Sequence, residues 1–144
     1  MRAPSSQRVR EVLASVLAVA DDTVVHCCAA HPPVELLVTA GAGAVSVDAT
    51  LLTPQEDEAI GVAVEQGRGL LLGTVPSLDV RLDLAAAADP VRVLWRRLGF
   101  DHDRLPGTVV VTPTCGLAGA SPGHAREALT ACAEIARRLG EEPE

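Results

Sequence analysis

The sequence predicts an α/β fold in which one helix precedes four strand–helix units and all strands run parallel. Four short, nearly continuous apolar runs predict parallel strands that are buried on both faces of a sheet. Segments with apolar residues at helical spacing separate these runs, and glycine or proline marks most of the boundaries. The chain of 144 residues has the length of one domain, so we expect a single domain over residues 1–144.

The first half of the chain is expected to form a helix and two strand–helix units. Ser6 can cap the first helix, and one face of that helix should be buried because its apolar residues follow helical spacing. These residues are Val9, Val12, Leu13, Val16 and Leu17. A strand over residues 24–28 follows, and Pro32-Pro33 then starts a short helix that ends at Gly41 or Gly43.

The second strand covers residues 44–48, and the helix after it opens with a capping box. Thr53-Pro54-Gln55-Glu56 places an N-cap threonine three residues before a glutamate, and Gly67 ends this helix. The third strand covers residues 69–75. Asp89-Pro90 is then expected to open a helix that ends at Gly99.

The fourth strand, residues 108–111, leads to Cys115 and to a last helix that begins at Ser121-Pro122. The apolar side of this helix is expected to carry Leu129, Cys132, Ile135 and Leu139. Right-handed crossovers between parallel strands favour a curved sheet. Because a complete eight-unit barrel needs about 250 residues, four units would form a (βα)4 half of a TIM-type (βα)8 barrel.

Composition and charge exclude two classes of partner. The net charge of −7 argues against a nucleic-acid backbone, which requires clustered basic residues. No apolar run reaches the length of a membrane span, and residues 1–6 lack the apolar stretch of a signal peptide. We therefore expect a cytoplasmic protein whose four cysteines are reduced and available to bind a metal or to take part in catalysis.

Four potential metal ligands follow strands that should end at the same edge of the sheet. His26 and Cys28 alternate with Cys27, so they share one face of the first strand while Cys27 points to the other. Asp48 closes the second strand, and Cys115 follows the fourth. Imidazole and thiolate ligands favour zinc, and the carboxyl ends of parallel strands are where active sites lie. The sequence therefore predicts a Zn²⁺ site of His26, Cys28 and Cys115, with Asp48 as a fourth candidate that either binds or supports the metal or caps the loop after its strand.

The other cysteines and histidines have simpler explanations. Cys132 lies on the apolar side of the last helix, and Cys27 lies on the strand face that points away from the metal site. Both are expected to be packing residues. His31 lies near the expected metal site, where it either contacts a substrate or is an ordinary loop residue. His124 is expected at the surface or at a helix cap.

Three segments together resemble a known family. His26-Cys27-Cys28-Ala29, residues 45–48 and the turn Pro113-Thr114-Cys115-Gly116-Leu117 are similar to the C-terminal zinc-binding barrel of cobalamin-independent methionine synthase and its shorter relatives. The resemblance implies that His26, Cys28, Asp48 and Cys115 bind zinc. The carboxylate is usually glutamate in the best-known members of this family, and Asp48 is one methylene shorter. Asp48 would then bind zinc directly or through water, or would leave an open fourth position.

The resemblance also implies a reaction and partners. The expected activity is methyl transfer from a 5-methyltetrahydrofolate-type donor to a zinc-bound homocysteine thiolate, which yields methionine. In the family the other half of the barrel supplies contacts to homocysteine and folate. The chain is therefore expected to act as a homo-oligomer or with a complementary half-barrel chain. The alternative is a non-catalytic remnant domain that binds zinc or a thiol.

Overall fold

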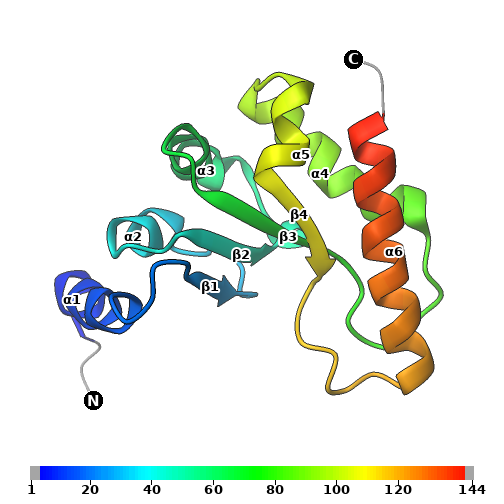
Figure 1. Ribbon diagram of the computed structural model, residues 1–144, viewed down its shortest axis with the longest axis horizontal. Coiled ribbons are helices and arrows are strands. Elements are labelled where there is room, and N and C mark those ends of the chain that lie inside the picture. Colours follow the sequence, from blue (N-terminus) through cyan, green and yellow to red (C-terminus); the bar gives the residue numbers. More distant parts are fainter. Residues whose placement is uncertain (1–3, 142–144) are drawn as a thin grey trace.

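The computed structural model describes residues 4–141 and confirms an α/β fold with a helix first and a four-stranded, all-parallel sheet (Figure 1). The sheet has the strand order β1-β2-β3-β4. The longer elements are α1 (Ser6–Leu17), β1 (Val24–Cys27), α2 (Val34–Thr39), β2 (Ala44–Asp48), α3 (Asp57–Glu65), β3 (Gly69–Val75), α4 (Leu84–Leu98), β4 (Val109–Pro113) and α6 (Pro122–Glu141). Short helical turns are η1 (Ala49–Leu51), η2 (Pro54–Glu56), η3 (His102–Arg104) and α5 (Leu105–Thr108).

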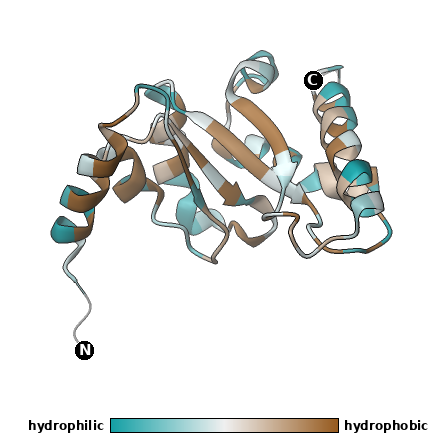
Figure 2. Ribbon diagram, turned by 60° about the horizontal axis from the view of Figure 1, so that its bottom comes forward, coloured by the Kyte–Doolittle hydropathy of each residue, from teal (hydrophilic) through white to brown (hydrophobic). Residues whose placement is uncertain are grey.

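Side chains from the four strands form rows across the sheet. Val45 of β2 pairs with Val25 of β1 and with Leu70 of β3, and Leu70 pairs with Val109 of β4. This row, and a second row two residues further along, face the connecting helices and form the centre of the core. Figure 2 shows that apolar residues dominate the strands, whereas α1 and α6 carry both polar and apolar positions.

The opposite face of the sheet is more open than expected. Val24 at one edge and Val110 at the other are 53% and 55% exposed, so the expectation that the strands are buried on both faces is wrong at the sheet edges. The reason is topological: right-handed crossovers between sequential neighbours place their helices on the same face. The open face carries the row His26, Ser46, Leu71 and Val110.

Helix α1 packs less completely than predicted. Ser5, not Ser6, is its N-cap: the Ser5 side chain accepts a hydrogen bond from the backbone N–H of Arg8. No residue of α1 is fully buried, and Val12 and Val16 are exposed. Only part of the predicted apolar stripe contacts the core, through Leu13 and Leu17. The apolar pattern predicted the helix correctly but predicted a wider buried face. Helix α1 packs at the edge of the sheet, beside α2.

Helix α4 begins six residues before the predicted Asp89-Pro90 opening. Asp83 is the N-cap, and its carboxylate accepts hydrogen bonds from the backbone N–H groups of Ala85 and Ala86 at 3.0 and 3.1 Å. Alanine has the highest helix propensity, so the alanine run after this cap extends the helix in the N-terminal direction. Pro90 therefore lies inside the helix, where it removes one backbone hydrogen bond.

Helix α6 confirms three of its four predicted core positions. Cys132, Ile135 and Leu139 are buried, but Leu129 is 58% exposed because it lies about 100° around the helix from the buried Ala128. His124 is buried rather than at the surface, and its Nε2 atom lies 3.0 Å from the carbonyl oxygen of Pro76.

Other predicted helix boundaries agree with the structure. Gly41 and Gly67 follow helices with φ angles of 105° and 74°, a conformation that glycine adopts without steric cost. Within residues 4–141, none of the helices combines the length and apolar character needed to cross a bilayer.

Candidate metal centre

Three of the four predicted ligands lie together at the carboxyl ends of β1 and β4. Potential ligand atoms of His26, Cys28 and Cys115 all lie within 4.8 Å of one another, and the two Sγ atoms are 3.5 Å apart. All three residues are exposed. His26 lies in β1, Cys28 directly follows it, and Cys27 between them packs half-buried on the other face. The predicted alternation along β1 therefore holds.

Cys115 reaches Cys28 although β1 and β4 are the two outer strands of the sheet. Three strand spacings would separate these strands by about 14 Å in a flat sheet. After β4 the chain crosses the open face of β3 above Gly73, and the backbone N–H of Thr114 donates a hydrogen bond to the carbonyl oxygen of Val75 at 2.9 Å. The single chain thus gathers the three donors without a second subunit.

Gly73 makes room for this crossing. A Cβ atom at Gly73 would lie 2.7 Å from Thr114 Cα, 2.9 Å from the Pro113 carbonyl oxygen and 3.1 Å from the Val47 carbonyl oxygen. Carbon atoms in ordinary contact are about 3.5–4.0 Å apart, so any side chain here would push the segment before Cys115 outward. The sequence pattern places Gly73 in the third strand and indicates no role for it.

Ser46 holds the His26 ring. It is the register partner of His26 on β2, and its buried hydroxyl lies 2.9 Å from His26 Nδ1. In the tautomer that donates this hydrogen bond from Nδ1, the lone pair of Nε2 is free for a metal. Ser46 was missed from the sequence because strand register, which the sequence did not define, places it beside His26.

The donor set fits zinc. Two thiolates on one tetrahedral Zn²⁺ ion lie roughly 3.8 Å apart when each Zn–S distance is about 2.3 Å, and the sulfur atoms of Cys28 and Cys115 are close to that separation. Three protein donors with an open fourth position are also the usual composition of a catalytic zinc site.

The two thiols influence each other's ionisation. The hydrogen bond shared with Cys115 and the repulsion between the two sulfur charges raise the pKa of Cys28 above its ordinary value, with a smaller contribution from burial. Metal binding must displace the retained proton, so the affinity for a metal should increase as the pH rises.

Asp48 is not part of the group of three donors. Its Oδ1 atom accepts hydrogen bonds from the backbone N–H and the hydroxyl of Thr50, at 2.9 and 2.6 Å, and caps η1. This engagement is the ordinary role of an aspartate at the end of a strand. Direct ligation by Asp48 stays a prediction that this geometry does not favour.

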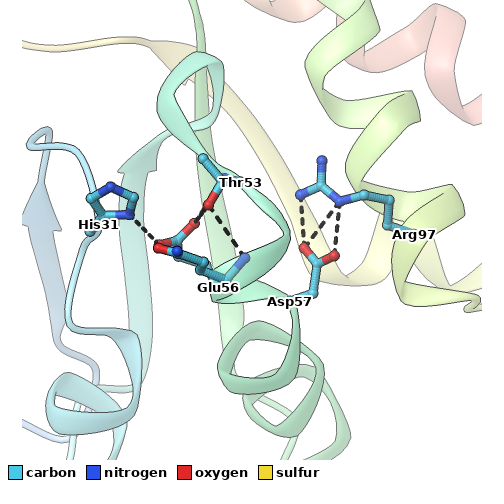
Figure 3. Close-up of polar contacts among 6 residues, drawn as sticks. His31, Thr53, Glu56, Asp57 and Arg97 are labelled. Atoms are coloured by element: carbon cyan, nitrogen blue, oxygen red, sulfur yellow. Dashed lines mark hydrogen bonds and ion pairs between the residues drawn. The ribbon is translucent and has the colours of Figure 1, made fainter.

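His31 forms a second polar cluster at the carboxyl end of β1. Its Nδ1 atom lies 2.9 Å from Oε1 of the buried Glu56, whose Oε2 accepts hydrogen bonds from the backbone and hydroxyl of Thr53 (Figure 3). Burial raises the pKa of Glu56, but the hydrogen bonds from His31 and Thr53 together outweigh it and lower that pKa. His31 has a positive φ of 54°, which is a strained backbone conformation for a residue other than glycine. Its contact with Glu56 holds this loop, three residues after Cys28, in place. A substrate contact is not needed to explain His31.

A separate ion pair joins α3 to α4. Arg97 contacts both carboxylate oxygens of Asp57, with its closest approach at 2.7 Å (Figure 3). This pair stabilises packing between two helices and is not part of the group of three donors.

A surface hollow of about 540 Å³ lies between α1, α2 and η2. Arg10, Glu35 and Glu56 are among its lining residues, but none of the three metal donors is. The three exposed donors therefore lie outside this hollow.

No protein-family model matches the chain, and a search of curated proteins finds no match either. The chemistry of the site therefore follows from its own residues and their geometry.

Proposed function

We propose that this chain binds one Zn²⁺ ion through His26, Cys28 and Cys115, and that it is the zinc-binding half of a TIM-type barrel that transfers a methyl group to a thiol. One observation carries the proposal: a histidine and two cysteines from opposite edges of the sheet bring their ligand atoms within 4.8 Å. An isolated cysteine is usually a packing residue, but such a convergence of three soft donors is characteristic of a metal site.

The proposed chemistry follows from the donors and from the resemblance to cobalamin-independent methionine synthase. When bound, Zn²⁺ would supply the positive charge that allows a small thiol to lose its proton at neutral pH. Cys28 and Cys115 would donate electron density and keep that substrate sulfur nucleophilic. Ser46 would fix the orientation of His26. By the resemblance, the thiol is homocysteine and the methyl donor a 5-methyltetrahydrofolate-type compound.

Turnover is proposed to require a second half-barrel, provided by another copy of the chain or by a complementary polypeptide. All three donors are exposed, and the open face beside them ends in the exposed residues Val24 and Val110. Catalysis by charge stabilisation works best where water is excluded. A second half-barrel would cover this face and would pair with the unpaired edges of β1 and β4.

The same exposure favours a second candidate function, a non-catalytic domain that binds zinc or a thiol. Such a domain would need the three donors but no enclosed substrate site. The two functions share the metal centre and differ in whether methyl transfer occurs.

Metal analysis tests the shared part of the proposal. We expect about one Zn²⁺ per wild-type chain, and loss of zinc from Cys28→Ser and Cys115→Ser. Cys27→Ser is the matched control and should retain zinc, because Cys27 packs on the other face of β1. Equal loss from all three variants, or a zinc-free wild type, would show that the ligand set is wrong.

A methyl-transfer assay separates the two functions. Methylated folate and homocysteine would be incubated with the zinc-loaded chain, alone and with a complementary half-barrel. We expect methionine only when the second half-barrel or a homo-oligomer is present, with Asp48→Asn less damaging than Cys115→Ser. If no methionine forms under either condition, the binding-domain function is the correct one.

A further inference from the structure

The two exposed thiols of the candidate metal centre have a second chemical capacity that requires no metal. Cys28 and Cys115 are 87 residues apart in the chain, yet their sulfur atoms are 3.5 Å apart. We propose that, when no metal is bound, Cys28 and Cys115 are a thiol–disulfide exchange site that forms an intramolecular disulfide with a small-molecule disulfide as oxidant. This inference does not depend on the proposed methyl transfer.

The geometry requires only a small movement. A disulfide has an S–S distance of about 2.05 Å, so the two sulfur atoms must approach by roughly 1.5 Å. Cys115 lies in the irregular segment between β4 and α6, and Cys28 lies just beyond the last residue of β1. Cys115 is exposed, and a Cβ atom at the next residue, Gly116, would meet no atom within 4 Å outside its chain neighbours, so this turn is not tightly packed. Side-chain rotation and a small loop shift can therefore supply the approach.

The exchange is balanced in two steps. The thiolate of one cysteine attacks a sulfur of the small disulfide, which forms a mixed disulfide and releases one small thiolate. The second cysteine thiolate then attacks the protein sulfur of the mixed disulfide, forming the Cys28–Cys115 bond and releasing the second small thiolate. The two cysteine protons pass to the released thiolates. Two protein thiols are oxidised, and one small disulfide is reduced to two thiols.

The other two cysteines provide internal controls. Cys27 is next to Cys28 in the chain but is half-buried on the opposite face of β1. Cys132 is buried in α6, so a small disulfide in solution cannot reach its thiol, and burial also raises the pKa of that thiol to about 11. Oxidation should therefore select Cys28 and Cys115 from the four cysteines.

Peptide mapping tests the inference. The metal-free chain, kept dilute with a chelator, would be incubated with oxidised glutathione, blocked with an alkylating agent and digested with trypsin. Arginine positions predict that Cys27 and Cys28 fall in peptide 11–68, Cys115 in peptide 105–126 and Cys132 in peptide 127–137. We expect the first two peptides to be linked in monomeric protein, with two of the four thiols lost.

Two variants identify the partner of Cys115. Cys27→Ser should still form the link between peptides 11–68 and 105–126, and Cys28→Ser should lose it. The inference is overturned if wild type keeps all four thiols, if peptide 127–137 is the linked partner, if the linkage joins two chains, or if Cys28→Ser retains the link. A parallel sample loaded with Zn²⁺ separates the two proposals. Oxidation at the same rate with and without zinc would refute zinc binding by this pair and leave the disulfide assignment standing.

Discussion

Gly73→Ala should damage the metal centre from a position that contributes no ligand. The chain that delivers Cys115 passes over Gly73, and it does so because glycine has no side chain there. Adding one methyl group leaves all three donors chemically unchanged. Any loss of metal affinity must then come from displacement of the segment before Cys115.

The size of the displacement can be worked out from the structure. The new Cβ atom would lie 2.7 Å from Thr114 Cα, whereas carbon atoms in contact need about 3.5 Å, so the Thr114 backbone must move by about 0.8 Å. Metal–ligand distances tolerate only about 0.2 Å. Part of the shift can be absorbed by the loop, so we expect zinc affinity to fall about tenfold or more, which corresponds to about 1.4 kcal/mol.

Cobalt substitution provides the assay, because Co²⁺ accepts the tetrahedral ligands of zinc and its absorption reports each bound thiolate. Gly73→Ala should bind Co²⁺ more weakly than wild type and with a weaker thiolate-to-metal charge-transfer band, whereas Cys115→Ser, which should lose the metal, should show no such band. Gly69→Ala is the matched control: it makes the same change on the same face of β3 but at the other end of the strand. There the added Cβ meets only the Ala44 side chain, at 3.2 Å.

A role for Gly73 in positioning Cys115 would be refuted if Gly73→Ala bound Co²⁺ with the wild-type spectrum and affinity. It would also be refuted if Gly69→Ala weakened metal binding equally, since the effect would then be a general loss of sheet stability. Thermal unfolding of both variants without metal measures the general loss of folding stability. Overpacking typically costs about 1–3 kcal/mol of that stability.

Three further predictions concern the hydrogen bond that orients His26 and the stability of the fold. Ser46→Ala should weaken zinc binding about tenfold in a chelator competition titration, since His26 loses its orienting hydrogen bond; unchanged affinity would remove Ser46 from the site. The lowered pKa of Glu56 stabilises the fold above its ordinary pKa of 4.5, and this stability is lost as the pH falls through the lowered value. Glu56→Gln should therefore flatten the decline of urea-unfolding stability below about pH 4.5, and a decline as steep as in wild type would contradict the assignment. Ile135→Ala should cost about 2–5 kcal/mol and the exposed Leu129→Ala under about 0.5 kcal/mol in the same urea assay; similar costs would show that the buried stripe of α6 is misplaced.

Local chemistry determined much of the fold. Apolar runs, capping residues and helix-ending glycines identified the four strands and most helices, because those signals act over a few residues. The early start of α4 was missed because Pro90 gave a stronger boundary signal than the cap at Asp83. The burial of α1 and the exposure of Leu129 depend on which neighbours each helix meets, and helical spacing alone does not specify those neighbours.

For the candidate site, the sequence determined the donors and their faces, and the tertiary structure decided which of them meet. Alternation along β1 is a local property, so it separated His26 and Cys28 from Cys27 in advance. The Cys28–Cys115 approach required the chain to cross β3 at Gly73, and the Ser46 contact required a particular register between β1 and β2. Asp48 was predicted from the sequence to lie with the other donors, but in the structure its carboxylate accepts hydrogen bonds from the hydroxyl and the backbone N–H of Thr50. Convergence of distant residues depends on sheet register and close backbone approach, which are fixed only when the whole domain packs.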